Sequence, residues 1–400
     1  MSDELAVRRH WIPPGGLLTG FAAHGLSWIV LFFIAVRRLL TIDFPALAWV
    51  HLVALGWLTM IALSVLIHVI PTFTDVPWKG ELLARRALAV YAPGVAALVA
   101  AFWWRAFPVL PWAATLVGVG LGCYLLAALR TLAAGYARPR VEAAIARALS
   151  ATLTSLFVTA ALGIALAWML AGRLSPALSV SGPPIHATFG TIGWLTVLVM
   201  GVSTRTVRPI TGARSRNAFA HAAAGSAEIV GLIVTAAGLA LGWLSIAWAG
   251  AITVAAGALL YVGDLVDVLR RASERHRPPQ AFLWAGSVWF LTGLALALYA
   301  LAGGGAGVAA VYVLLAGWIG QMVNGHLYHI GVRLIATMAR GDDDETSPGE
   351  LLKEPLSWSH SVFSKLLSCS EGWACSSKIR RSLTRQRALV LPAGSRCSST

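Results

Sequence analysis

Seven of the ten histidines lie inside long apolar segments, where a polar side chain is costly and needs a partner or a function. They are His24, His51, His68, His186, His221, His326 and His329. Imidazole nitrogens bind haem iron and copper, and they also carry protons near neutral pH. A carboxylate, Glu228, lies in the middle of another apolar segment, with no Lys or Arg within one helical turn. These residue types favour metal binding or proton transfer.

An internal repeat relates the segments that hold most of these histidines. The dipeptide Gly-Trp occurs at Gly56–Trp57, Gly193–Trp194 and Gly317–Trp318, with spacings of 137 and 124 residues. Twelve residues after each glycine stand His68, Arg205 and His329. A repeat of this length indicates a fold built from similar units, and each unit here holds about four membrane-spanning helices. The Gly-Trp residues themselves are predicted to be structural.

The composition is that of a membrane protein. The chain is 58% hydrophobic and 12% charged, with a mean hydropathy of +0.73. Apolar runs of about 20 residues, enough to cross a bilayer as helices, recur ten times. They cover roughly 16–37, 46–71, 87–108, 110–134, 148–172, 183–207, 218–242, 244–269, 281–302 and 306–338. We expect an all-α polytopic membrane protein of about ten transmembrane helices, with residues 1–340 as one helical bundle.

The net charge of +14 reflects topology rather than binding to nucleic acid. Of the 21 Lys and Arg residues before position 333, 17 fall on one side of the predicted spans and four on the other. The positive-inside rule then places both termini in the cytoplasm. A high content of Ala and Arg suggests a bacterial source, so we expect the bacterial inner membrane. The expected partner is the lipid bilayer, and no nucleic acid is expected.

Depth in the membrane sorts the histidines into two groups. His51 precedes its Gly-Trp by five residues and His186 by seven, so both are predicted to lie near the outer surface. This placement in two repeats favours a haem or copper site shared by the two side chains. The alternative is a pair of interfacial polar residues that bind nothing.

Four side chains are predicted near the cytoplasmic end. His68, Arg205 and His329 share one repeat position, so we expect them to approach one another around a pseudo-threefold axis. His326 is three residues before His329, so both could face one centre. The cluster is interpreted either as a second set of ligands or proton carriers, or as a hydrogen-bonded polar cluster that satisfies Arg205.

Three further residues are candidates for a proton relay. His24 lies within the first span, and His221 and Glu228 are seven residues apart on one face of the seventh. A carboxylate at mid-span is by default a functional hypothesis. The alternative is a protonated Glu228 that is hydrogen-bonded to a neighbouring helix.

The composition changes abruptly after residue 340. Residues 341–400 are rich in Ser, Arg and Cys and contain no apolar run long enough to span a membrane. Two interpretations remain open: a disordered cytoplasmic tail, or a reading frame shifted near residue 360, in which case two native helices are missing.

The segments 49–73, 185–212 and 320–336 resemble the haem-copper oxidase subunit I superfamily, and within it the oxidase-like NnrS family. The resemblance implies twelve helices in three four-helix arcs, bound haem b and copper, and contact with other respiratory membrane subunits. It places His51 and His186 at two of the family's ligand positions.

The chain departs from the oxidase pattern at the remaining ligands. The outer half of the tenth span has Tyr312 and no histidine, the outer half of the seventh span has none, and Gly190 stands four residues after His186. We therefore expect a haem- or copper-binding protein that is accessory to respiration, nitric-oxide stress or metal handling, and not an enzyme. The alternatives are a divergent oxidase or nitric-oxide reductase subunit I, and a proton-coupled or metal transporter.

Overall fold

The computed structural model describes residues 13–36, 43–136, 143–273 and 278–340, and this part of the chain is helical without strands. It contains ten helices long and apolar enough to cross a membrane, which confirms the predicted number. They are Pro14–Val36, Phe44–Thr74, Glu81–Trp103, Leu110–Tyr136, Ile145–Leu170, Gly182–Thr211, Phe219–Leu241, Leu244–Arg270, Pro278–Leu301 and Gly307–Val332. Large apolar side chains point outward, including Leu18 (69% exposed) and Phe32 (64%), as expected of a surface that faces lipid. The tail, 341–400, lies outside the described residues.

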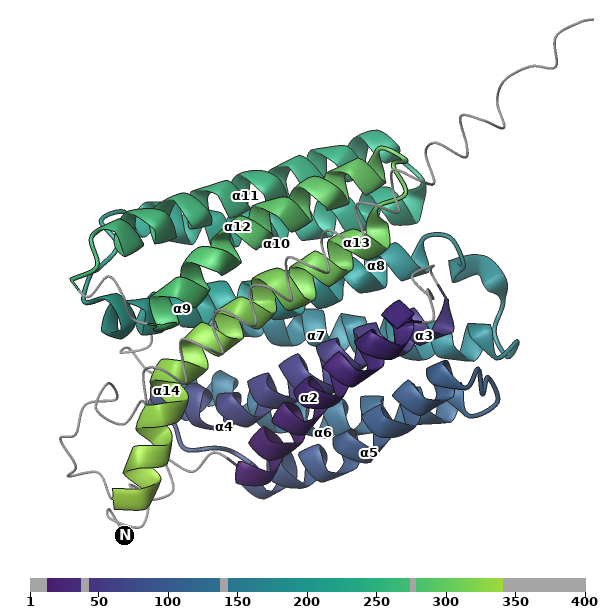
Figure 1. Ribbon diagram of the computed structural model, residues 1–400, viewed down its shortest axis with the longest axis horizontal. Coiled ribbons are helices and arrows are strands. Elements are labelled where there is room, and N and C mark those ends of the chain that lie inside the picture. Colours follow the sequence, from purple (N-terminus) through teal and green to yellow (C-terminus); the bar gives the residue numbers. More distant parts are fainter. Residues whose placement is uncertain (1–12, 37–42, 137–142, 274–277, 341–400) are drawn as a thin grey trace, which may run out of the picture.

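Seven of the spans are single α-helices. These are α2 (Pro14–Val36), α5 (Glu81–Trp103), α6 (Leu110–Tyr136), α7 (Ala143–Leu170), α10 (Ala218–Leu241), α11 (Leu244–Arg270) and α12 (Pro278–Leu301). Helices α2 to α6 form one side of the bundle and α10 to α12 the opposite side, with α14 crossing between them (Figure 1). A short 3₁₀ segment, η2 (Pro176–Leu178), follows α7.

The three spans that carry Gly-Trp share a feature absent from the sequence-based prediction. Each is an α-helix interrupted by a π-helical segment centred on the Gly-Trp. The spans are α3 (Phe44–His51), η1 (Leu52–Thr59) and α4 (Met60–Thr74); α8 (Gly182–Thr188), η3 (Phe189–Thr196) and α9 (Val197–Thr211); and α13 (Gly307–Tyr312), η4 (Val313–Ile319) and α14 (Gly320–Arg340). Since π-helical turns are rare, their recurrence at the same place in all three Gly-Trp spans supports the internal repeat.

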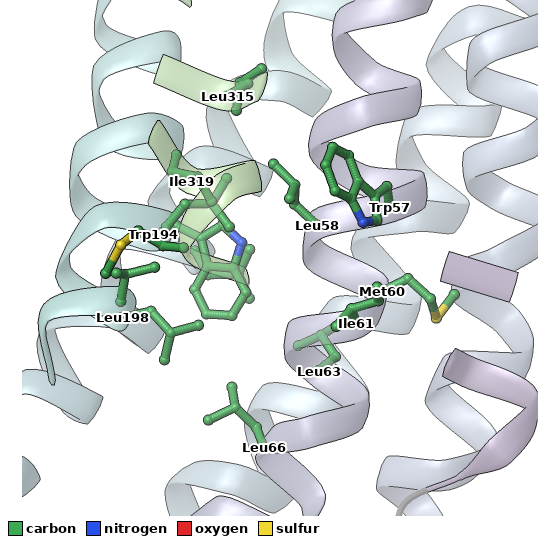
Figure 2. Close-up of a cluster of buried hydrophobic side chains, with 14 of the residues drawn as sticks. Trp57, Leu58, Met60, Ile61, Leu63, Leu66, Trp194, Leu198, Leu315 and Ile319 are labelled. Carbon is green, nitrogen blue, oxygen red and sulfur yellow. The ribbon is translucent and has the colours of Figure 1, made fainter. Parts of the chain in front are cut away.

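The three π-helical segments are joined by hydrogen bonds between one repeat's Trp and another's Thr. Trp194 Nε1 donates to Thr59 Oγ1 (2.9 Å), and Trp318 Nε1 donates to Thr196 Oγ1 (3.0 Å). Both threonines stand three residues after the glycine of their repeat. Figure 2 shows how apolar side chains from all three repeats pack around this centre.

The third link of this arrangement is not formed. At the equivalent position the third repeat has Gly320, and a Cβ there would come within 2.8 Å of Trp57 Cη2. Trp57 therefore packs onto Gly320, and its buried Nε1 has no hydrogen-bond partner among the described residues. The pseudo-threefold arrangement is thus closed by two hydrogen bonds and one contact.

The helix pairs α5–α6 and α10–α11 are copies at the 137-residue spacing. A Cβ on Gly94 would lie 2.9 Å from Val117 N, and one on Gly231 would lie 2.7 Å from Val254 N. Each glycine permits close approach of two backbones, as small residues do in membrane helix pairs. Residues 137 apart can therefore be compared directly between the first and second repeats.

Candidate functional site

The structure brings the rings of His51 and His186 together where the first and second repeats meet. The ring centroids are 6.2 Å apart, and the ring planes are inclined by 21°. Both side chains lie close to the start of a π-helical segment, His51 as the last residue of α3 and His186 near the end of α8. Phe102 of α5 also stacks on His51, with a centroid distance of 4.8 Å.

Both rings are held in the same way. His51 Nδ1 lies 2.7 Å from the Leu47 carbonyl oxygen, and His186 Nδ1 lies 3.0 Å from the Thr159 carbonyl oxygen. Because a carbonyl only accepts, each Nδ1 carries the proton and donates. The neutral rings therefore keep an unprotonated Nε2, which is the form that binds a metal.

The two histidines do not occupy the same position in their repeats. Tyr312 is the repeat equivalent of His51, and Trp49 is the equivalent of His186. Trp49 and Tyr312 also pair, with ring centroids 4.2 Å apart and planes 5° from parallel. At two of the repeat junctions, the position five residues before one Gly-Trp therefore pairs with the position seven residues before another. The pair is His51 with His186 at one junction and Tyr312 with Trp49 at the other.

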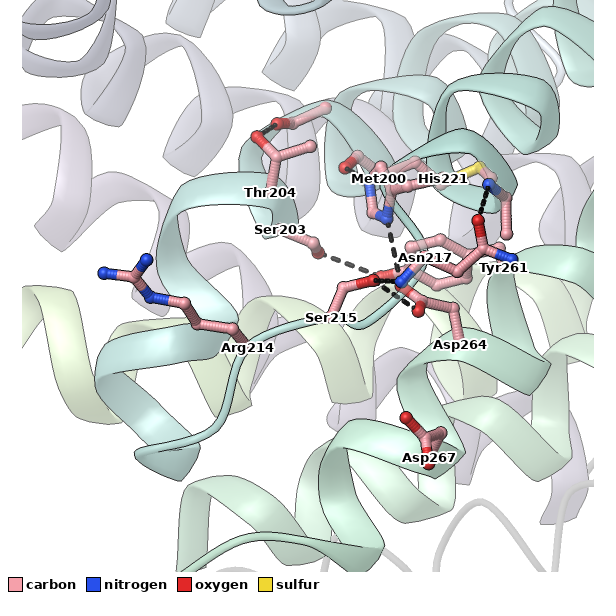
Figure 3. A network of polar contacts seen from close by, with 12 residues as sticks. Met200, Ser203, Thr204, Arg214, Ser215, Asn217, His221, Tyr261, Asp264 and Asp267 are labelled. Carbon is pink, nitrogen blue, oxygen red and sulfur yellow. Dashed lines mark hydrogen bonds and ion pairs between the residues drawn. The ribbon is translucent and has the colours of Figure 1, made fainter.

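A second polar region lies within the second repeat, where α9, α10 and α11 meet (Figure 3). His221 Nε2 lies 3.2 Å from the Met200 carbonyl oxygen, and His221 Nδ1 lies 3.5 Å from Asp264 Oδ2. Ser215 donates to the other oxygen of Asp264 at 2.6 Å. His221 and Asp264 therefore form a contact pair, with Ser215 bound to the Asp264 oxygen that does not face the histidine.

The polar region continues toward the third repeat. Tyr261 donates to Ser203 Oγ (2.9 Å), and Ser203 donates to the Val199 carbonyl (2.6 Å). His326 Nε2 lies 3.5 Å from Ser203 Oγ, while His326 Nδ1 donates to the Met322 carbonyl at 2.6 Å. His326 is buried, with 8% of its surface exposed. It thus contacts the second repeat through Ser203, and His329 lies close enough to act on it electrostatically.

Glu228 is the most buried of the candidate residues. It is 0% exposed, and neither carboxyl oxygen has a hydrogen-bond partner among the described residues. Its equivalent in the first repeat is Tyr91, whose hydroxyl donates to the Leu55 carbonyl in η1 at 2.9 Å. No hydrogen bond joins Glu228 to a neighbouring helix in this part of the chain.

The remaining candidate residues make contacts elsewhere than at the His51–His186 pair. Trp28 Nε1 donates to His24 Nε2 (3.0 Å), and the His24 ring packs edge-on against Trp57, with centroids 3.7 Å apart. His68 and His329 are half-buried, and Arg205 is exposed, with its guanidinium 5.8 Å from the centre of the Phe73 ring. Phe73 belongs to α4, so Arg205 reaches the first repeat. A shared centre of His68, Arg205 and His329 remains a prediction.

Sequence reasoning missed Asp264, Tyr261 and Ser203. The available signal was the 137-residue spacing, which matches Asp264 with Ala127 and Ser203 with Leu66. Tracing polar residues at positions that are apolar in the other repeat would have identified Asp264 and Ser203, but not Tyr261, which matches Tyr124.

Known proteins offer no guide to these sites: no protein-family model and no curated protein matches the chain. Among the described residues, no group of three or more His, Cys, Asp or Glu side chains is placed to hold a metal ion. Any metal bound by His51 and His186 would therefore take two ligands from this pair and the others from elsewhere.

Proposed function

We propose that this protein is an oxidase-like integral membrane protein that binds one redox metal centre, haem iron or copper, between His51 and His186. The observation that carries the proposal is the 6.2 Å separation of the two ring centroids, together with the Nδ1–carbonyl contact of each ring, which leaves both Nε2 atoms available as ligands.

The residues around the pair fit such a centre. The Leu47 and Thr159 carbonyls would fix the tautomer and orientation of the ligands, as hydrogen-bond acceptors beside metal-bound histidines do. Gly163 leaves room for the His186 ring, because a Cβ there would come within 3.0 Å of Cε1. When bound, haem or copper would supply one-electron chemistry.

The ligand inventory supports an accessory role over oxygen reduction. Where a third repeat histidine would stand, the chain has Tyr312 stacked on Trp49. His51 and His186 would hold the haem or copper, and among the described residues no third His, Cys, Asp or Glu completes a metal-binding group with them. We propose a role in respiration, nitric-oxide stress or metal handling, with other respiratory membrane subunits as partners.

We further propose the bacterial cytoplasmic membrane as its location, with both ends of the chain in the cytoplasm and the His51–His186 pair near the outer face. The 17-to-4 distribution of basic residues supports this orientation. Reporter fusions at Ser181 and Gly305 should then read as periplasmic, and fusions at Arg140 and Arg275 as cytoplasmic. The reverse pattern would refute it.

The test of the metal centre is an absorption spectrum of the purified protein, oxidised and reduced, together with metal analysis. His51→Ala and His186→Ala should each lose the bound haem or copper, whereas the control His221→Ala should keep it. Unchanged cofactor content in both variants would refute the proposal. Oxygen uptake by the pure protein would instead favour a divergent oxidase.

A second candidate function is proton-coupled transport. The observation that favours it is the polar region of the second repeat, where His221, Asp264 and Glu228 lie among largely apolar helices. Proton-dependent uptake of a metal ion by vesicles that contain the protein, in the absence of bound haem or copper, would select this alternative.

A further inference from the structure

We propose that Glu228 binds a proton in the interior of the membrane and exchanges it with the His221–Asp264 pair along one face of α10. The proposal does not depend on a metal at His51 and His186, because none of its residues belongs to that pair.

The burial of Glu228 identifies the proton as its ligand. An ionised carboxylate with no partner is very costly in a membrane bundle, and protonation removes most of that cost. A metal cation would need several oxygen ligands around the carboxylate. Both Glu228 oxygens are buried without a hydrogen-bond partner in the described part of the chain. Glu228 is therefore a neutral carboxylic acid at rest.

The first repeat shows that the fold does not require a carboxyl group here. Tyr91 fills the equivalent position, is also buried, and satisfies its hydroxyl on the Leu55 carbonyl. The equivalent carbonyl in the second repeat belongs to Ile192, and the shorter Glu228 makes no such bond. Glu228 thus lacks the hydrogen bond that Tyr91 makes, as expected for a carboxyl group whose role is to release and rebind a proton.

A route to the aqueous end follows the same face of α10. His221, Gly225 and Glu228 are spaced by four and three residues, so they align on one face, with about 10 Å of helix between the two ends. No atom lies within 4 Å of the place where a side chain on Gly225 would begin. The proposal places a water molecule in this open space, between the side chains of His221 and Glu228. Beyond it, the His221 side chain is 21% exposed and that of Asp264 is 8% exposed.

The elements packed against α10 are α7, α8, η3, α9 and α11. The titratable and charged residues on them are Arg147, His186, Arg205, Arg208, Tyr261, Asp264, Asp267 and Arg270. Of these, Asp264 contacts His221 through its carboxylate and Tyr261 through its ring, with centroids 5.6 Å apart. The exchange partner of Glu228 is thus the His221–Asp264 pair.

The transfer conserves atoms and charge. The Glu228 O–H bond breaks and its proton passes to the water beside Gly225, which releases a proton to the pair, where an N–H or O–H bond forms. Glu228 becomes a carboxylate, and the pair gains one positive charge. The reverse step restores the resting state, and no electron moves.

Infrared spectroscopy of the purified protein in lipid nanodiscs tests both parts of the proposal. A band from a protonated carboxyl group should be present in the parent and lost in Glu228→Gln. On transfer to D₂O this band should shift as the proton is exchanged. Gly225→Val, which fills the space for water, should slow the exchange several-fold, whereas Ala222→Val, on the exposed side of α10, should leave it unchanged.

Two results would overturn the proposal: a parent spectrum without a carboxyl band that depends on Glu228, or equal exchange rates in the Gly225→Val and Ala222→Val proteins. If Glu228→Gln does not fold, Glu228→Tyr replaces it, since tyrosine stands at this place in the first repeat. Because the readout needs no haem or copper, its failure is distinct from failure of the metal centre.

Discussion

The first and second repeats place similar helices around different interiors. In the first repeat, Ala84 and Ala127 fill positions that His221 and Asp264 take in the second, and both alanines are fully buried. The close contacts between α5 and α6 recur between α10 and α11. The polar residues of the second repeat are therefore not needed to build the helix pair. Comparing the two repeats therefore separates the residues that build the helix pair from the polar residues that could give the second repeat its function.

The strongest test of this separation exchanges Tyr91 and Glu228. Tyr91→Glu removes the hydrogen bond to the Leu55 carbonyl and buries a carboxyl group, so we expect a loss of about 3–5 kcal/mol in the free energy of unfolding. Glu228→Tyr should cost much less, because tyrosine is the residue that this packing accommodates in the first repeat. Thermal unfolding in detergent measures both. Equal losses would mean that the two sites are not equivalent.

A smaller and symmetric effect is expected at the helix contacts that the two repeats share. Gly94→Ala and Gly231→Ala each place a methyl group against a backbone nitrogen of the neighbouring helix, so each should cost about 1–3 kcal/mol. Gly122→Ala, at a position with no atom within 4 Å, is the control and should be neutral or slightly stabilising. A large difference between the two glycines would show that the helix pairs are packed differently.

The smallest expected effects concern the three tryptophans. Trp194→Phe and Trp318→Phe each remove one hydrogen bond to a threonine and should cost about 1 kcal/mol. Trp57→Phe removes an indole N–H that has no hydrogen-bond partner and should cost less than either. The midpoints of thermal unfolding rank the three variants. If Trp57→Phe lowers the midpoint of thermal unfolding most, the conclusion that Trp57 forms no hydrogen bond to the third repeat is wrong.

The fold was largely predictable because hydrophobic length is a strong signal. All ten predicted spans correspond to helices in the structure, with ends that differ by a few residues. The repeat of Gly-Trp located the three central spans and, through depth, the meeting of His51 and His186. The π-helical segments were not predictable, because their residues, such as LVALGWLT and FGTIGWLT, have the same apolar pattern as an α-helix.

The contacts of individual polar side chains were less accessible to sequence analysis. His326 was grouped with His329, and the sequence did not reveal its contacts with Ser203 and the Met322 carbonyl. A depth estimate gives the level of a residue in the membrane, whereas its partner depends on the rotation of the helix about its axis. Wherever a π-helical segment intervenes, this rotation no longer follows the α-helical period.

This rotation has a consequence for how such a protein can change during evolution. The i to i+5 bonding of η1, η3 and η4 accommodates more residues per turn than an α-helix does. Loss of one residue there would favour α-helical bonding and turn the following half of the span by about 100°. If a single codon were deleted in a Gly-Trp segment, the half of the span that follows the segment would therefore turn a new set of side chains toward the bundle. The half that carries His51 or His186 would stay in place.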